Sequence, residues 1–252
     1  MTIVPFPTRR WNIKALLLCH IIVALMVSTW LWPVTRPAWE ALDVWFFKLL
    51  NGTLRGHPTW QAFWALANHK LADWVEDFFV LGFFIAYVRK SPQKLRSVAS
   101  LLFIILYIAA IIYYVNCILF RETLRIEHPS PTLVVDNCVR LSHEIDWLKI
   151  KDSSSRSFPA YHGTTAVLFA ASYTILAGRR LGFYASLYAT FLCLPRLIAG
   201  SHWLSDIIVG SGSLTLLFLS WAFCTPFSQK CIDLFERSFQ WCRLNSKKIF
   251  IK

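Results

Sequence analysis

Six long apolar segments dominate this chain of 252 residues and restrict it to folds that a lipid bilayer permits. A helix needs about 20 predominantly apolar residues to cross the hydrocarbon core. Helices suit that environment because their backbone hydrogen bonds are satisfied internally. The segments lie at about residues 13–32, 74–88, 97–119, 163–178, 182–199 and 205–224. We therefore predict an all-α integral membrane bundle of six transmembrane helices, which forms a single domain over residues 1–252.

Basic residues are distributed unevenly between the predicted loops, and this asymmetry predicts the orientation of the chain. With the N-terminus inside, the inner segments hold 15 of the 26 basic residues but only two of the 14 acidic residues. Positive charge is retained on the cytoplasmic side of membrane proteins. We expect both termini, including the tail 225–252, to be cytoplasmic. The net charge of +12 then needs no nucleic-acid partner.

Two segments between the predicted spans are expected to form helices on the outer face. Residues 38–54 repeat apolar side chains at helical spacing, as an interfacial helix does. The apolar positions are Trp39, Leu42, Phe46 and Leu49, and the opposite face holds Glu40, Asp43 and Lys48. In the loop 120–162, Asp136 is expected to cap a short helix whose apolar stripe is Leu141, Ile145 and Leu148.

An arginine, a histidine and an aspartate interrupt the apolar run PRLIAGSHWLSDIIVG at 195–210. On a continuous helix, Arg196 and His202 would point about 240° apart, so we expect the helix to break at Gly200. His202 and Asp206 have i, i+4 spacing and share a helix face. The carboxylate can hold one imidazole nitrogen and leave the other as a nucleophile or base. The alternative is that these side chains are only interfacial anchors.

Further polar residues lie at neighbouring helix ends on the same predicted side. His162 is in RSFPAYHGT at 156–164, directly before the fourth span. Arg121 follows the third span, and His128 and Pro129 come shortly after it. Polar groups at three helix ends on one face of a membrane bundle predict an active site.

These residues resemble the type 2 phosphatidic acid phosphatase superfamily, whose signature is K-x6-RP, PSGH and SR-x5-H-x3-D. The third element here reads PRLIAGSHWLSD and keeps the arginine, the histidine and the aspartate. The second reads PAYH, with Ala160 and Tyr161 in place of serine and glycine. The first reads RETLRIEHP, with Arg121 for the lysine and His128 for the arginine.

Within that superfamily, the chain is similar to inner-membrane enzymes that move a phosphate from undecaprenyl diphosphate to lipid A. The similarity runs from about residue 38 to the tail and includes SPTL at 130–133, KDSS at 151–154 and TPFSQK at 225–230. It implies a multi-pass phosphotransferase of the cell inner membrane with a periplasmic active site. Its partners would be a lipid diphosphate donor and a lipid phosphate acceptor such as lipid A 1-phosphate, with a phosphohistidine intermediate and no cofactor or metal.

The resemblance also implies a role for each residue. His202 would attack phosphorus, Asp206 would orient it, and His162 would protonate the departing lipid phosphate. Three residues would bind the phosphate oxygens: Arg196, Arg121 and His128. Four others are candidates for substrate contacts: Tyr161, Ser157, Arg125 and Arg156. Two alternatives stay open, a phosphatase that uses water as the acceptor and a non-catalytic lipid-binding membrane protein. The sequence identifies no protein partner.

Overall fold

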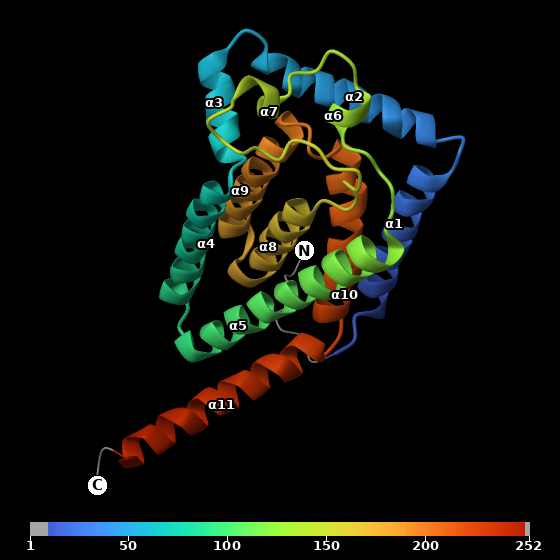
Figure 1. Ribbon diagram of the computed structural model, residues 1–252. Helices are drawn as coiled ribbons and strands as arrows, with labels where there is room; N and C mark the ends of the chain where they lie inside the picture. The colour runs from blue at the N-terminus through green and yellow to red at the C-terminus, as the bar shows by residue number, and fades with distance from the viewer. Residues whose placement is uncertain (1–9, 250–252) are drawn as a thin grey trace.

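The computed structural model describes residues 10–249, and these form a helical bundle (Figure 1). Its longer helices are α1 (Ile13–Leu31), α2 (Arg36–Asn51), α3 (Pro58–Ala67), α4 (Lys70–Lys90), α5 (Lys94–Ala110), α8 (Tyr161–Ala177), α9 (Arg179–Ile198), α10 (Gly212–Phe223) and α11 (Phe227–Ile249). Shorter elements are η1 (Gly52–Leu54), η2 (Ile111–Leu124), α6 (Pro131–Val134), α7 (Leu141–Glu144) and η3 (Asp206–Ser211). The all-α prediction is confirmed for this part of the chain. Arg9 and Lys252, which the charge argument places inside, lie outside the described residues.

Four of the described helices are long and apolar enough to cross a membrane: Ile13–Leu31, Lys94–Leu124, Arg179–Ile198 and Asp206–Phe223. They match the first, third, fifth and sixth predicted spans, and the third and sixth each continue through a π-helical stretch. The second predicted span falls in α4, which carries charged residues at both ends, and the fourth in α8, which has 17 residues. The count of six spans therefore stays a prediction.

The antiparallel pair α8 and α9 occupies the centre of the bundle (Figure 1). Small side chains let the two helices approach closely, and Ala166, Ala170, Ala189 and Cys193 form one buried cluster between them. On one side, the hydroxyl of Tyr173 on α8 donates to the backbone oxygen of Phe83 on α4 at 2.8 Å. On other sides α8 contacts α5 and α10. The α8–α9 hairpin is thus surrounded by α4, α5 and α10.

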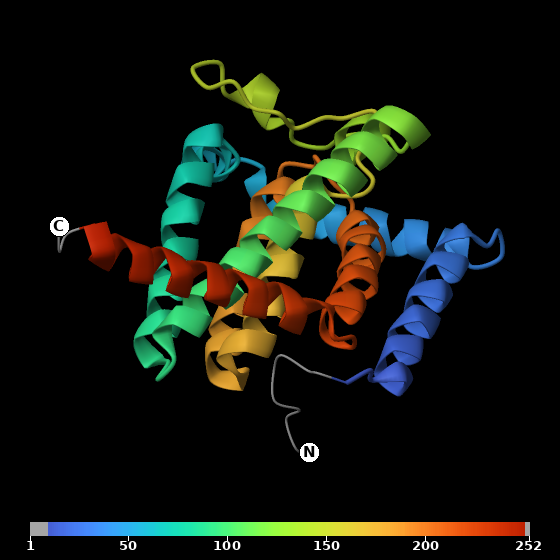
Figure 2. The same cartoon turned by 90° about the horizontal axis from the view of Figure 1, so that it is seen from below.

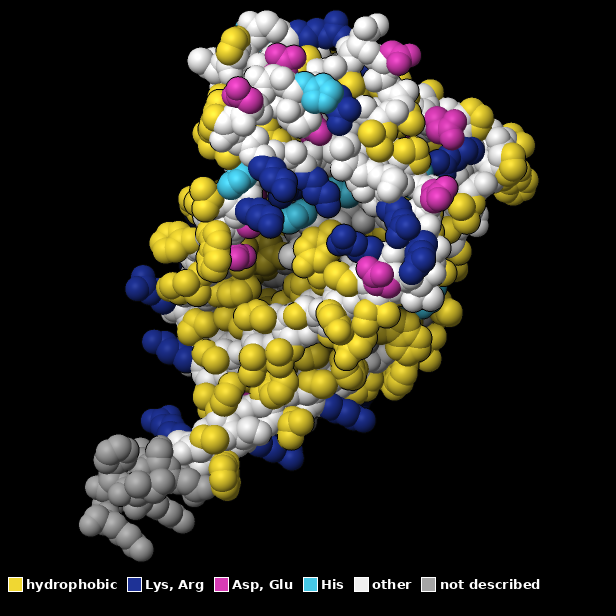
Figure 3. All heavy atoms as spheres, viewed as in Figure 1, with side chains coloured by type: hydrophobic (Ala, Val, Ile, Leu, Met, Phe, Trp, Pro, Cys, Tyr) yellow, Lys and Arg dark blue, Asp and Glu magenta, His cyan; other side chains and the backbone are white. Residues whose placement is uncertain are grey.

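Apolar side chains cover the flank of the bundle, and charge gathers towards its two ends (Figure 3). Helix α1 alone exposes Leu17, Leu18, Ile21 and Leu25. A contiguous exposed apolar surface of this kind is expected where a protein faces lipid. We call the end of the bundle that α2 covers the α2 end, and the opposite end, which α11 covers, the α11 end (Figure 1). Helix α11 lies across the second of these, packed against α5 (Figure 2).

Helix α2 confirms the helix predicted in 38–54, but one side chain of its polar face points inward. Asp43 is buried, and its carboxylate accepts the backbone N–H and the hydroxyl of Ser205 at 2.8 and 2.5 Å. Leu42 and Leu49, which belong to the predicted apolar stripe, are exposed. Asp43 turns inward because it caps the chain just before η3. Whether α2 lies at a membrane interface stays a prediction.

The loop before α8 differs from its predicted form in two respects, the cap and the length of its short helix. Asp136 does not cap α7, because the N–H of Ser142 is taken by the Asp152 carboxylate at 2.9 Å. Asp152 lies ten residues further along the chain, so a rule based on neighbouring residues cannot find it. Leu141 and Ile145 are buried as predicted, but α7 ends at Glu144, so Ile145 and Leu148 lie beyond the helix and the predicted helical stripe is wrong.

Candidate active site

Arg196 and His202 lie on either side of a break in the helix, as the sequence predicts. Helix α9 ends just before this point, and Gly200 has a φ of +75°. A Cβ atom on Gly200 would lie 2.6 Å from Cγ2 of Thr132 and 2.8 Å from Cε2 of Phe47. Glycine is therefore required both by its backbone conformation and by the close packing of α2 and the loop over the break.

Asp206 is fully buried between two imidazole rings. Its Oδ2 lies 3.3 Å from Nδ1 of His202 and accepts the backbone N–H of Trp203 at 2.9 Å. Its Oδ1 lies 3.1 Å from Nδ1 of His128. The predicted pair of His202 and Asp206 is present, and Nε2 of His202 remains on the far side of the ring from the carboxylate. The second imidazole beside Asp206 was not predicted.

His162 lies near the start of α8 and faces a cation. Its Nε2 is 3.5 Å from Nη2 of Arg196. Burial lowers the pKa of His162 from its usual value, and the positive charges of Arg196, His202 and Lys151 act in the same direction. The side chain is consequently neutral at pH 7 in this arrangement.

The residue after His162 allows α8 to approach η3. A Cβ atom on Gly163 would lie 3.0 Å from Oγ of Ser211 and 3.1 Å from Cγ1 of Ile207. A larger residue would displace α8 from η3, whose first residue is Asp206. Close packing at Gly163 therefore helps to bring the two histidine-bearing segments together.

Arg196 is held by two residues outside the recognised motif. Its Nη1 donates to the backbone oxygen of Asn68 at 2.5 Å and also to the Asn68 side-chain oxygen. Its Nη2 lies 3.3 Å from Oδ1 of Asp73. Sequence reasoning missed both residues as part of the site. The sequence did offer one signal, the carboxylate of Asp73 in the first turn of α4. It did not point to the site, because helix N-termini favour negative charge in any case.

Of the remaining candidates, the structure brings Ser157 and His128 into the buried part of the site. Ser157 is fully buried, and its hydroxyl donates to the backbone oxygen of His128 at 2.8 Å. The hydroxyl oxygen of Ser157 also lies 3.0 Å from Nδ1 of His128. The backbone pairs as well, because the N–H of Ser157 donates to the oxygen of His128 at 2.8 Å. Two parts of the long loop are thus joined beside Asp206.

The other predicted substrate contacts lie at the rim. The side chain of Arg121 is 70% exposed and lies 4.0 Å from the Glu122 carboxylate. Arg156 donates to the backbone oxygen of Arg121 at 3.3 Å, and Arg125 donates to that of Glu122 at 2.9 Å. The exposed ring of Tyr161 lies 5.3 Å from that of His162. Lys, Arg and His side chains are seen together just above the apolar flank in Figure 3.

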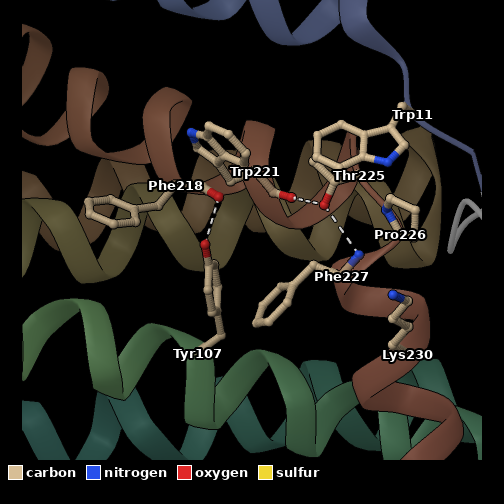
Figure 4. Close-up of a pocket in the computed structure, with 8 residues that line it drawn as sticks. All are labelled: Trp11, Tyr107, Phe218, Trp221, Thr225, Pro226, Phe227 and Lys230. Carbon is tan, nitrogen blue, oxygen red and sulfur yellow. Dashed lines mark hydrogen bonds between the residues drawn. The ribbon is translucent and has the colours of Figure 1, made fainter.

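A separate hollow of about 550 Å³ lies between the segment just before α1 and helices α5, α10 and α11 (Figure 4). Trp11, Trp221 and Phe227 line it. Tyr107 also lines it, and its hydroxyl donates a hydrogen bond to the backbone oxygen of Phe218 at 2.7 Å. None of the predicted site residues contributes to this hollow. No group of three or more His, Cys, Asp or Glu side chains within residues 10–249 is arranged to hold a metal ion.

A comparison with protein families identifies this constellation. The family model described as the PAP2 superfamily matches residues 101–230, a stretch that contains both histidines, Asp206 and Arg196. The chain belongs to the PAP2 superfamily. It is also 26% identical over 229 residues to lipid A 1-diphosphate synthase of Escherichia coli (strain K12), which covers 90% of this chain and 94% of that protein. No solved structure matches the chain. The protein is therefore an enzyme of the PAP2 phosphatase and phosphotransferase superfamily, and lipid phosphates are its class of substrate.

Proposed function

We propose that this enzyme is a phosphotransferase that moves a phosphate from undecaprenyl diphosphate to a lipid acceptor such as lipid A 1-phosphate, through a phosphohistidine. The observation that carries the proposal is the charge around the two histidines. His202 contacts the Asp206 carboxylate at 3.3 Å, whereas His162 lies 3.5 Å from the Arg196 guanidinium. One ring is arranged to gain positive charge, and the other to lose a proton to a leaving group. The name of the E. coli relative supports lipid A as the acceptor.

In the first step, His202 is the nucleophile. Asp206 accepts a hydrogen bond from the Nδ1–H group of His202, which leaves the Nε2 lone pair free to attack the terminal phosphorus of the donor. The N–P bond forms as the bond from phosphorus to the bridging oxygen breaks. The ring becomes positively charged in this step, and the Asp206 carboxylate stabilises that charge.

His162 and Arg196 serve the leaving group and the phosphoryl oxygens. The guanidinium of Arg196 binds the oxygens, where its N–H groups match the spreading negative charge. The bound phosphate offsets the charge of Arg196, so His162 takes up a proton and then gives it to the departing undecaprenyl phosphate. Such a proton transfer contributes about 100- to 10,000-fold to the rate.

In the second step, an oxygen of the acceptor phosphate attacks the phosphohistidine, and the N–P bond breaks to release His202. The exposed rim residues Arg121, Arg125 and Arg156 supply positive charge for the head group of the acceptor. Tyr161 is placed to contact its sugar. Transfer rather than hydrolysis requires that the bound acceptor exclude water from the phosphoenzyme.

The proposed location is the inner membrane, with a periplasmic active site and cytoplasmic termini. Four candidate spans and the apolar flank support a multi-pass protein. The turn before His202 packs against Phe47 of α2, at the end of the bundle away from the basic helix α11 (Figure 1). This supports the orientation, because basic segments are retained in the cytoplasm.

The test follows a labelled phosphate. Purified protein is incubated with undecaprenyl diphosphate carrying label in its terminal phosphate, with and without lipid A, and rapidly quenched samples are analysed for label on lipid, protein and free phosphate. We expect acid-labile label on the protein and, with lipid A present, label on lipid A. Free phosphate as the main product in both reactions would make water the acceptor. No labelled protein at any time would contradict the phosphohistidine route.

A further inference from the structure

An arginine from a distant part of the sequence lies against His128, the position where the superfamily signature has an arginine. Nη2 of Arg36, the first residue of α2, is 3.2 Å from Nε2 of His128. The guanidinium is fixed by further contacts: Nε donates to Glu40 at 2.9 Å, and Nη1 donates to the backbone oxygen of Trp30 at 3.3 Å. It also lies over the Trp30 ring, 4.1 Å from the ring centre. Arg36 is therefore held in place on three sides.

The neighbours of His128 determine which of its nitrogens carries the proton. A guanidinium has only donors, so the Nε2 atom facing Arg36 must be the acceptor. The hydroxyl proton of Ser157 is used by the backbone oxygen of His128, so its oxygen accepts from Nδ1 at 3.0 Å. The Asp206 carboxylate, 3.1 Å from the same Nδ1, is also an acceptor. Ser157 and Asp206 thus require a proton on Nδ1, and Arg36 requires an acceptor at Nε2, which together define the Nδ1–H tautomer.

We propose that Arg36 is a positioning residue that locks His128 in the Nδ1–H tautomer, so that the positive end of this N–H group lies against Asp206. The Asp206 carboxylate then has an imidazole N–H on each side: Nδ1 of His128 lies 3.1 Å from Oδ1, and His202 and Trp203 contact Oδ2. A proton on Nε2 of His128 would face the N–H groups of Arg36, so the guanidinium disfavours the Nε2–H tautomer. The charge of Asp206 therefore remains available to His202.

This inference assigns His128 a different role from that of a phosphate ligand. Both of its ring nitrogens are occupied by Arg36, Ser157 and Asp206. Its ring is also enclosed by Trp30 and Phe158, whose ring centres lie 5.5 and 6.1 Å away. The catalytic consequence rests on the proposed function, because it takes His202 as the nucleophile, whereas the tautomer of His128 can be measured without any reaction.

The first test is spectroscopic. Protein labelled with 15N-histidine is studied by NMR, and the signal of His128 is identified by its loss in the His128→Asn variant. We expect the wild type to show an Nδ1–H ring, Arg36→Lys to retain it, and Arg36→Met to lose it. Glu40→Gln is the matched control, because it removes an ion pair of Arg36 but not the contact with His128. An Nε2–H ring in the wild type, or an unchanged signal in Arg36→Met, would overturn the proposal.

The second test measures the consequence for the reaction. We expect Arg36→Met to slow phosphohistidine formation about ten-fold at saturating donor, and Arg36→Lys to restore most of the rate. His128→Arg should be strongly impaired, because it sets two guanidinium groups against each other. Adding Arg36→Met to His128→Arg should recover part of the rate, since it removes that repulsion. If Arg36 served only to stabilise α2, the double variant would be worse than either single variant.

The two tests separate this inference from the proposed function. Absence of phosphohistidine in the wild type would contradict the proposed function, and the NMR signal of His128 would still decide the tautomer. An Nδ1–H signal that depends on Arg36, combined with an unaffected rate of phosphohistidine formation in Arg36→Met, would overturn the positioning role.

Discussion

The two histidines at the centre of the site have the same side chain but opposite surroundings. His202 contacts a buried carboxylate, and His162 contacts a guanidinium. A negative neighbour favours a ring that gains positive charge, whereas a positive neighbour favours a ring that gives up its proton. The comparison shows how one residue type can serve as nucleophile and as general acid within one site, through its neighbours alone.

The surroundings of the two histidines also differ in their exposure to solvent. Asp206, Ser157 and Ser205 have no exposed surface, whereas Tyr161 on the other side is 45% exposed. The nucleophile is thus oriented by a rigid, dry arrangement, which preserves its geometry in every turnover. The acid side opens towards the rim, where the donor and then the acceptor must enter.

The largest expected effect comes from replacing His202, the histidine beside the Asp206 carboxylate. His202→Asn should reduce turnover of any donor by at least about 10,000-fold, because it removes the nitrogen that carries the phosphate in the proposed mechanism. The measurement is acid-labile label on the protein after rapid quenching. Circular dichroism and size-exclusion profiles matching the wild type serve as the folding control. Labelled protein in this variant would assign the nucleophile elsewhere.

His162→Gln should show a loss that depends on the leaving group. With undecaprenyl diphosphate we expect a decrease of about 100- to 10,000-fold, since the departing phosphate needs a proton. With p-nitrophenyl phosphate the decrease should be slight, because p-nitrophenolate leaves without protonation. Rates for the two donors are compared in the same preparation. Equal losses with both donors would contradict the general-acid role and weaken the contrast between the histidines.

Asn68→Ala tests the support of Arg196. We expect kcat/KM to fall about ten-fold, because the guanidinium loses the side-chain oxygen of Asn68 and keeps only the backbone oxygen as an acceptor at this position. Gln61→Ala is the matched control: it also removes a buried amide from α3, one that donates to the oxygen of Leu54 at 2.9 Å. Both variants should lose about 1–3 kcal/mol of stability in thermal denaturation. A similar fall of kcat/KM in both would mean that Asn68 acts only through stability.

The smallest effect concerns the proton on His162. The lowered pKa of His162 leaves its ring neutral at pH 7, and a bound diphosphate raises that pKa, so binding should take up as much as one proton. Affinity should therefore decrease as the pH rises through the pKa of the complex. Calorimetry with a short prenyl diphosphate in two buffers of different ionisation enthalpy measures the uptake, in the His202→Asn background to prevent turnover. Uptake that persists after His162→Gln would place the proton on another group.

The sequence predicted the parts of this site that depend on local spacing. The break at Gly200 followed from the angle between Arg196 and His202 on a helix, and the pair His202 and Asp206 followed from i, i+4 spacing. Apolar length likewise predicted the four candidate spans. These features need only the geometry of a single helix, which periodicity reports.

The sequence did not predict the residues that orient the motif from elsewhere in the chain. Asn68 contacts Arg196 across 128 positions, and Asp43 contacts Ser205 across 162. Such pairs depend on which face of a helix turns inward, and an exposed polar face has the same pattern as one with a single buried carboxylate. The wrong cap predicted for Asp136 has the same origin, since its competitor Asp152 comes from a later part of the loop.

Gly200 also sets an order of assembly. Its backbone is covered by Phe47 from α2 and by Thr132 from the long loop, so the turn before His202 cannot reach its final shape until both have docked. Contacts between segments so far apart in sequence form late in folding, because the intervening chain must first be ordered. We therefore expect the nucleophile to be among the last groups to acquire its place, so that a partly inserted chain would lack activity.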